Sequence, residues 1–130
     1  MANPRTTEQK RAERALKCVR DVKDDQGIKV SEYVTLVKRA PANIQTNGLG
    51  QTLAFWRSKG KGKRQDAAEV IYQDVSAWVC GQMGWQYNQN EHLLPHLTQC
   101  NTGNYRRATV EAMAFLSWLK RFAEAELGDD

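Results

Sequence analysis

The chain has 130 residues, three well-separated cysteines and a net charge of +4. This length predicts a single domain, residues 1–130, that can bury a core without disulfides or structural metal. An odd cysteine count without a CxxC motif argues against a disulfide framework or a zinc ribbon and fits a cytoplasmic protein. No apolar run reaches the roughly 18 residues of a membrane span.

The first predicted element is an amphipathic helix. The sequence "TTEQ" offers a capping box from Thr6 to Gln9, in which each side chain binds the backbone of the other. Apolar residues then recur at spacings of three and four, and the helix is expected to end at the turn signal "DDQG". The residues on its apolar face are Ala12, Ala15, Leu16, Val19 and Val22.

Two helices are predicted over residues 33–48. The first carries Tyr33, Val34 and Val37 and should stop before Pro41, because the residue before a proline is disfavoured in the helical region. Pro41 can then open a short helix that ends at Gly48 in a left-handed conformation.

Four more helices complete the prediction. The first covers about residues 49–59, and "GKGK" then breaks the chain. Asp66 caps the next helix, which ends near Gly84, and a short helix follows over residues 93–100. The last starts at Asn104, frays at Leu127 and carries an apolar stripe of Ala108, Ala112, Phe115, Leu116, Leu119, Phe122 and Ala123. No sustained alternation of apolar and polar residues occurs, so we expect an all-α, compact bundle of about six to seven helices.

Positive charge is concentrated in one quarter of the chain. Residues 33–65 contain seven cationic and no anionic side chains, whereas the remainder is net negative. Such asymmetry favours a polyanionic partner, namely nucleic acid or an anionic membrane, although a solvated loop of mutually repelling charges would give the same pattern. The cations are Lys38, Arg39, Arg57, Lys59, Lys61, Lys63 and Arg64.

The "GLG" sequence at residues 48–50 does not form a nucleotide-binding fingerprint. A dinucleotide site needs a strand before its glycines, and here a helix is predicted instead. Gly48 is expected to end one helix, and Gly50 to let the next helix begin or pack closely. A helix starting after Gly48 could also present free N–H groups to a phosphate.

No catalytic or metal-binding constellation stands out. His92 and His96 lie four residues apart, but Pro95 between them disturbs the helical geometry that a shared metal would need. Cys100 with His96 has the spacing of a nucleophile and base without an orienting third group. The four tryptophans are expected to be core residues, except that Trp56, beside the cationic run, is a candidate for stacking on a base.

Two long blocks of the sequence resemble a known family. "IQTNGLGQTLAFWRSKGK" and "YRRATVEAMAFLSWLKRFAEAEL" are similar to the small subunit of the type III-B CRISPR effector, the Cmr complex. Residues 80–100 carry only the helical character of that family. The resemblance implies a small, all-helical, non-catalytic protein without a cofactor. It further implies that copies stack in a filament beside the backbone and large polymerase/cyclase subunits, along the channel where crRNA pairs with target RNA.

The residues and the resemblance together define an expected RNA-binding surface. A subunit that leaves sequence reading to guide pairing needs contacts with the RNA backbone. The polar residues Gln45 and Asn47, with Gln51, suit hydrogen bonds to RNA or to a neighbouring subunit, or else they cap helices. Arg57, Lys59, Lys61, Lys63 and Arg64 are the main phosphate-binding candidates, with Lys38, Arg39, Arg106 and Arg107 as further ones. The alternatives are a free-standing helical nucleic-acid-binding protein, and an enzyme that uses His92, His96 or Cys100.

Overall fold

Residues 4–128 fold into six α-helices. The computed structural model describes residues 4–128, and no strand occurs within them. The prediction of an all-α bundle of six to seven helices is therefore confirmed. The helices are α1 (Thr7–Asp24), α2 (Val30–Asn47), α3 (Leu49–Gly60), α4 (Ala67–Met83), α5 (Leu93–Leu97) and α6 (Thr102–Leu127).

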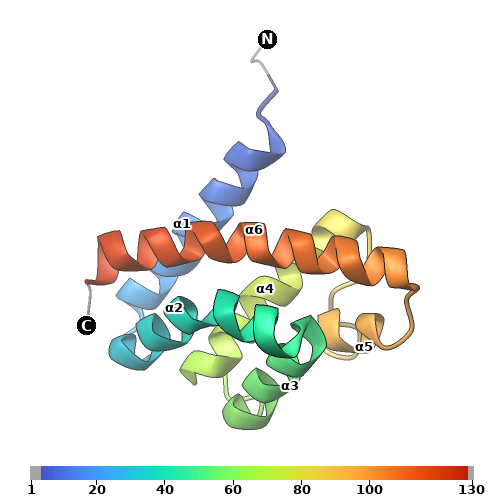
Figure 1. Ribbon diagram of the computed structural model, residues 1–130. Coiled ribbons are helices and arrows are strands. Elements are labelled where there is room, and N and C mark those ends of the chain that lie inside the picture. Colours follow the sequence, from blue (N-terminus) through green and yellow to red (C-terminus); the bar gives the residue numbers. More distant parts are fainter. Residues whose placement is uncertain (1–3, 129–130) are drawn as a thin grey trace.

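The longest helix, α6, lies across the others (Figure 1). It packs mainly against α1 and α2 and also contacts α4. Helices α3 and α4 pack against each other, and the loop between them lies on the side of the molecule away from α6 (Figure 1). This arrangement places the predicted cationic loop far from the helix that closes the bundle.

Several helix ends form as the sequence predicts. The capping box is present, because Gln9 N donates to Thr6 Oγ1 over 3.0 Å and Thr6 N donates to Gln9 Oε1 over 2.8 Å. The Asp66 carboxylate accepts a hydrogen bond from Ala68 N over 2.9 Å at the start of α4. Gly84 ends the same helix in the left-handed conformation, with φ of 73°.

The predicted helix break at Pro41 is wrong. Helix α2 continues through Pro41 to Asn47, so the two helices predicted over residues 33–48 are one. Proline disrupts a helix by removing one backbone hydrogen bond and by a clash with the preceding turn. Here the buried residues before and after the proline share one face of α2, and their packing in a common core outweighs this local penalty. They are Tyr33, Val37, Ala40 and Ile44.

The last two helices differ from prediction at their ends. Helix α5 stops at Leu97 rather than residue 100. Helix α6 begins at Thr102, because the Asn101 side chain caps it by accepting a hydrogen bond from Asn104 N over 2.8 Å. The apolar stripe of α6 faces the core as expected except for Phe122, which is only partly buried and stacks on Trp118 with ring centroids 5.5 Å apart.

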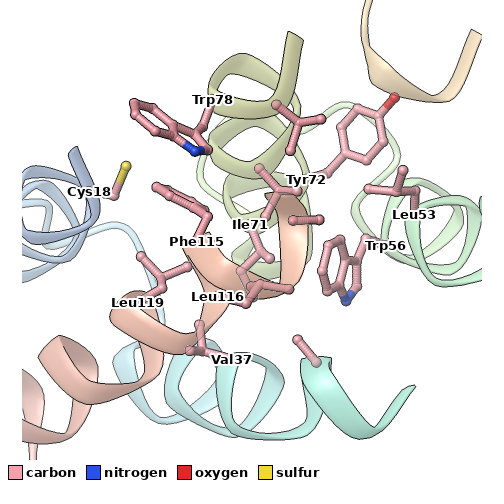
Figure 2. Packing of buried hydrophobic residues seen from close by; sticks show 14 of the residues in the cluster. Cys18, Val37, Leu53, Trp56, Ile71, Tyr72, Trp78, Phe115, Leu116 and Leu119 are labelled. Atoms are coloured by element: carbon pink, nitrogen blue, oxygen red, sulfur yellow. The ribbon is translucent and has the colours of Figure 1, made fainter. Parts of the chain in front are cut away.

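One cluster of buried side chains joins all six helices. Figure 2 shows Phe115, Leu116 and Leu119 of α6 in this cluster, together with Trp56 of α3 and Trp78 of α4. Trp56 is 0% exposed, so the expectation that it is available to stack on a base is wrong. Its apolar neighbours on α3, Leu49 and Leu53, point into the same core, which explains why the indole is buried.

Glu111 ties three helices together beside this core. Its carboxylate accepts hydrogen bonds from Arg11 Nε of α1 over 2.6 Å and from Trp78 Nε1 of α4 over 2.8 Å. Burial by itself would raise the pKa of Glu111, but these two donors outweigh it and hold the pKa below its usual value. The ion pair with Arg11 therefore holds α1, and the hydrogen bond from Trp78 holds α4, against α6.

Candidate nucleic-acid interface

The cationic loop, residues 61–64, projects from the end of α3. Lys61, Lys63 and Arg64 are all exposed. Lys61 and Gly62 both adopt positive φ, 53° and 72°, which turns the chain sharply between α3 and α4. Within residues 4–128 none of the three cationic side chains forms an ion pair with a carboxylate. Their positive charges are therefore available to an external anion.

The buried carboxylate of Glu69 anchors this loop. Glu69 is only 3% exposed and stands in the first turn of α4. It accepts hydrogen bonds from the backbone N–H of Gly62 over 3.2 Å and from Gln73 Nε2 over 2.7 Å. Because a buried carboxylate needs such donors, the loop and the start of α4 hold each other in place.

Close backbone contact at Gly60 reinforces the anchor. A β-carbon at position 60 would lie 2.7 Å from the backbone nitrogen of Glu69, which is closer than packed atoms approach. The last turn of α3 therefore lies directly against the first turn of α4, and only glycine fits there. Of the two glycines in "GKGK", Gly60 provides space and Gly62 provides the left-handed turn.

Two of the five main candidate cations are already engaged within the chain. Arg57 donates to Glu69 over 2.8 Å and lies over the Tyr72 ring at 5.0 Å from its centroid. Lys59 pairs with Glu32 at 3.3 Å, and both side chains are partly exposed. Arg57 thus supports the fold, whereas Lys59 remains able to exchange its partner for a phosphate, since exposed pairs are weak.

A shallow groove runs beside the cationic loop. It has a volume of about 420 Å³ and is lined by Gly27, Lys29, Glu32, Lys63, Arg64, Gln65, Asp66 and Ala67. The loop between α1 and α2 forms its other wall, and Gln65 Nε2 bridges the two by donating to Asp25 Oδ1 over 2.8 Å. Lys29 therefore adds a further cation to the edge of the surface.

The remaining candidate cations lie on other elements. Arg106 and Arg107 are exposed in the first turns of α6, where they line a separate hollow with Gln82, Met83 and Val110. Lys38 is partly buried and Arg39 is exposed, and both stand on α2. The structure thus groups Lys61, Lys63 and Arg64 in one loop and leaves these four residues on α2 and α6.

The polar residues around "GLG" are exposed. Gln45, Asn47 and Gln51 all face solvent at the junction of α2 and α3. Gly48 has a φ of 88° and ends α2. The close approach expected at Gly50 occurs within the chain, because Gly50 N donates to Tyr105 Oη of α6 over 2.8 Å. This N–H is therefore occupied, whereas the three carboxamides face outward.

The two histidines have different partners. His92 Nδ1 forms a hydrogen bond with Tyr72 Oη, and His96 Nε2 lies 2.7 Å from the carbonyl oxygen of Gln86. Burial, and next the nearby Arg57 charge, lower the pKa of His92. The Cys100 thiol donates weakly to Leu97 O over 3.7 Å rather than contacting His96. Within residues 4–128, no three His, Cys, Asp or Glu side chains are grouped as metal ligands would be.

The main feature that the sequence interpretation missed is Glu69. A signal for it existed, since an acid three residues after the N-cap Asp66 occupies the third helical position, where it can turn back toward the preceding loop. Its partners Arg57 and Gly62 could not be inferred, because they depend on how α3 packs against α4.

In the described part of the chain, no helix combines the length and the apolar character needed to cross a bilayer.

The structure defines a small helical protein with a buried core, an anchored cationic loop at one end of α3 and exposed carboxamides at the other end. Comparison with known proteins gives its family. Residues 7–126 match the model described as "CRISPR-associated protein (Cas_Cmr5)". The chain is 31% identical over 121 residues to the "CRISPR system Cmr subunit Cmr5" of Thermus thermophilus, covering 93% of this chain and 96% of that one.

A solved structure agrees with this match. The crystal structure of a CRISPR-associated Cmr5 family protein from Thermus thermophilus superposes with a TM-score of 0.71 at 28% sequence identity, covering 93% of this chain and 97% of that one. This chain therefore belongs to the Cmr5 family, the small subunits of the type III-B CRISPR effector. The resemblance noted in the sequence is thus confirmed.

Proposed function

We propose that this protein is a non-catalytic small subunit of a type III-B RNA-guided effector in antiviral defence, and that its cationic loop contacts the guide or target RNA. Copies of the chain stack in a filament in the cytoplasm, beside the backbone subunits and the large polymerase/cyclase subunit. Membership of the Cmr5 family supports the assembly. The sequence alone also suited a free-standing nucleic-acid-binding protein, but this family membership favours a subunit.

The proposed RNA contact is supported by the exposure of Lys61, Lys63 and Arg64 and by their lack of ion pairs in the described part of the chain. They are exposed and have no carboxylate partner within residues 4–128, and Glu69 holds their backbone in place. Binding RNA through such side chains releases counterions from the phosphates without losing internal ion pairs. An anchored loop also loses little conformational entropy on binding. Arg57 supports the loop from inside, and Lys59 contributes when its pair with Glu32 opens.

Further residues extend this surface. We propose that Gln45 and Asn47 form hydrogen bonds with RNA near the junction of α2 and α3, close in sequence to Lys38 and Arg39 on α2. Arg106 and Arg107 stand on α6 and line a different hollow from the one beside the loop. They would meet another stretch of the same RNA or an RNA-bearing neighbour.

The test measures the salt dependence of target RNA binding by the assembled effector. Changing Lys61, Lys63 and Arg64 to Ala should flatten the log–log slope by roughly two units per engaged copy, since each neutralised phosphate on a single strand contributes about −0.7. The control changes the exposed cations Lys10, Lys23 and Arg121 to Ala, which removes the same charge from α1 and α6. Equal slopes for the two variants would refute the RNA contact at the loop.

A further inference from the structure

Phe55 is an apolar side chain that the fold leaves outside. It stands on α3 between the buried Leu53 and Trp56, yet it is 50% exposed. With Asn43, Asn47, Gln51 and Thr52 it lines a hollow of about 240 Å³ between α2 and α3. Burial in the core therefore does not explain this aromatic ring, and its surroundings are otherwise polar.

The polar wall of the hollow has unused hydrogen-bonding groups. Within residues 4–128 the carboxamides of Asn43, Asn47 and Gln51 have no hydrogen-bond partner. Each carboxamide offers two donors and one acceptor oxygen. The Thr52 hydroxyl is different, because it already donates to Gly48 O over 2.9 Å. Thr52 therefore lines the hollow without offering a free donor. An uncharged, flat ligand with donors and acceptors along its edge matches this lining.

Cationic side chains flank the hollow on both helices. Arg39 precedes Asn43 by one turn on α2, and Lys59 follows Phe55 by one turn on α3. Residues four apart lie on the same face of a helix, so Arg39 and Lys59 each stand one turn from a residue that lines the hollow. Lys59 becomes available to a ligand there when its exposed pair with Glu32 opens. A neutral ring pocket between two cations fits a nucleotide, whose base is uncharged and whose phosphates are anionic.

We infer that this hollow binds one unpaired base of single-stranded RNA, stacked on Phe55 and hydrogen-bonded along its edge by Asn47 and Gln51. Bases that are splayed out of a strand bind proteins in this way, whereas paired bases are covered by their neighbours. The volume, below the roughly 300–1,000 Å³ of sites for drug-sized ligands, suits a single ring system. Large contiguous apolar patches mark protein-binding surfaces, whereas here one ring stands alone among carboxamides, which favours a small ring ligand. The inference rests on the proposed RNA contact and adds a base contact to it.

The experiment uses the assembled effector and target RNA with 2-aminopurine placed at successive positions, since stacking on an aromatic ring quenches this base. Phe55→Ala should relieve the quenching at one register and weaken RNA binding about 5- to 140-fold per engaged base, the equivalent of about 1–3 kcal/mol of stacking. Phe55→Trp should restore both signals. An RNA that is abasic at that register should bind the original and Phe55→Ala proteins equally. Thermal unfolding of each variant checks that the fold is intact.

The outcomes separate this inference from the proposed function. A stacking contact carries no charge, so Phe55→Ala should leave the salt slope unchanged while the variant of Lys61, Lys63 and Arg64 flattens it. If the cation variant flattens the slope but Phe55→Ala alters neither affinity nor quenching, the base site is refuted alone. If Phe55→Ala instead lowers recovery of the chain with the other subunits and leaves RNA binding per complex unchanged, the hollow is a protein contact and the inference is overturned.

Discussion

Arg57 and Glu69 form an ion pair at 2.8 Å in which the carboxylate side is almost completely buried, at 3% exposure, and the guanidinium is one-third exposed. Arg57 comes from the cationic segment and Glu69 from outside it. The pair therefore engages one cation of residues 33–65 within the fold, where it holds α3 against α4. The cations that remain available to RNA are those of residues 61–64.

Removing this anchor should destabilise the protein. Glu69→Ala leaves the guanidinium of Arg57 and the N–H of Gly62 without their acceptor, and a hydrogen bond to a charged group contributes about 1.5–3 kcal/mol. We expect the free energy of unfolding in urea to fall by about 2 kcal/mol, because the partly exposed guanidinium can recover some hydration. Glu32→Ala is the matched control, since its pair with Lys59 is exposed and should change stability by less than about 1 kcal/mol.

The two glycines of the cationic loop should respond differently to substitution. Gly60→Ala forces the new β-carbon against the backbone of Glu69, and such overpacking costs about 1–3 kcal/mol. Gly62→Asn should change stability little, because Asn tolerates positive φ and no atom lies within 4 Å of the added carbon. Denaturant unfolding of both variants measures the difference. Similar losses of stability at the two positions would contradict the view that Gly60 is needed for close packing and Gly62 for its positive φ.

Large side chains on the inner face of α6 should matter most for stability. Phe115→Ala and Leu119→Ala remove residues that are 0% exposed, so each should lower the free energy of unfolding by about 2–5 kcal/mol. Val110→Ala, on the same helix but 65% exposed, is the control and should change it by less than about 0.5 kcal/mol. A shift below that value for Phe115→Ala would show that the stripe does not face the core.

Gly50 should be required for the fold rather than for a partner. A β-carbon there would lie 3.0 Å from Tyr105 Oη, which also accepts the hydrogen bond from Gly50 N. We expect Gly50→Val to destabilise the isolated chain by about 1–3 kcal/mol and Tyr105→Phe by about 1 kcal/mol. Gly81→Val, where no atom lies within 4 Å, is the control. Unchanged thermal unfolding of Gly50→Val would show that the fold does not require glycine at this position.

Asp74 should contribute a loss of stability as pH rises from about 4 to about 7. Loss of hydration raises the pKa of this carboxyl from 3.8 to about 7, and it outweighs the opposing effects of the Cys18 hydrogen bond and the Arg14 charge. In this interval the unfolded chain releases the proton and the folded chain retains it, so the free energy of unfolding decreases as pH rises. Above about pH 7 both states are ionised and the penalty is constant.

The variant Asp74→Asn tests this behaviour, since it cannot ionise. It should be more stable than the original protein at about pH 8, and the difference should shrink toward about pH 4. Urea unfolding across this range provides the measurement, and about 1.4 kcal/mol is expected per unit of pKa difference. Parallel curves for the two proteins would show that Asp74 titrates normally in the folded state.

The sequence predicts helices well where local chemistry decides them. Thr6, Asp66 and Gly84 mark helix ends because their caps depend on residues within one turn. Pro41 misleads because the local penalty is overcome by packing between helices, which a local pattern does not contain. Trp56 misleads for the same reason, since its proximity to cations in sequence says nothing of the direction in which α3 buries its face.

The candidate interface was predictable only in part. The excess of cations in residues 33–65 is visible in the sequence, but the division into the engaged Arg57 and the available Lys61, Lys63 and Arg64 is not. That division depends on Glu69, which lies just outside the segment and meets it only after α3 and α4 pack together. Phe55 and Asn43 likewise come from different helices and share a hollow only because α2 and α3 fold back on each other.

The packing of α1 against α6 has a consequence for how the protein folds during synthesis. The first and last helices are each other's main neighbours, and Arg11 and Glu111 are joined across 100 positions of the chain. During translation the apolar face of α1 therefore lacks its main packing partner. It can be buried only after α6 has left the ribosome. Because such distant contacts close late, folding of this bundle should be completed only after α6 has been synthesised, and a nascent chain halted before α6 should remain sensitive to protease.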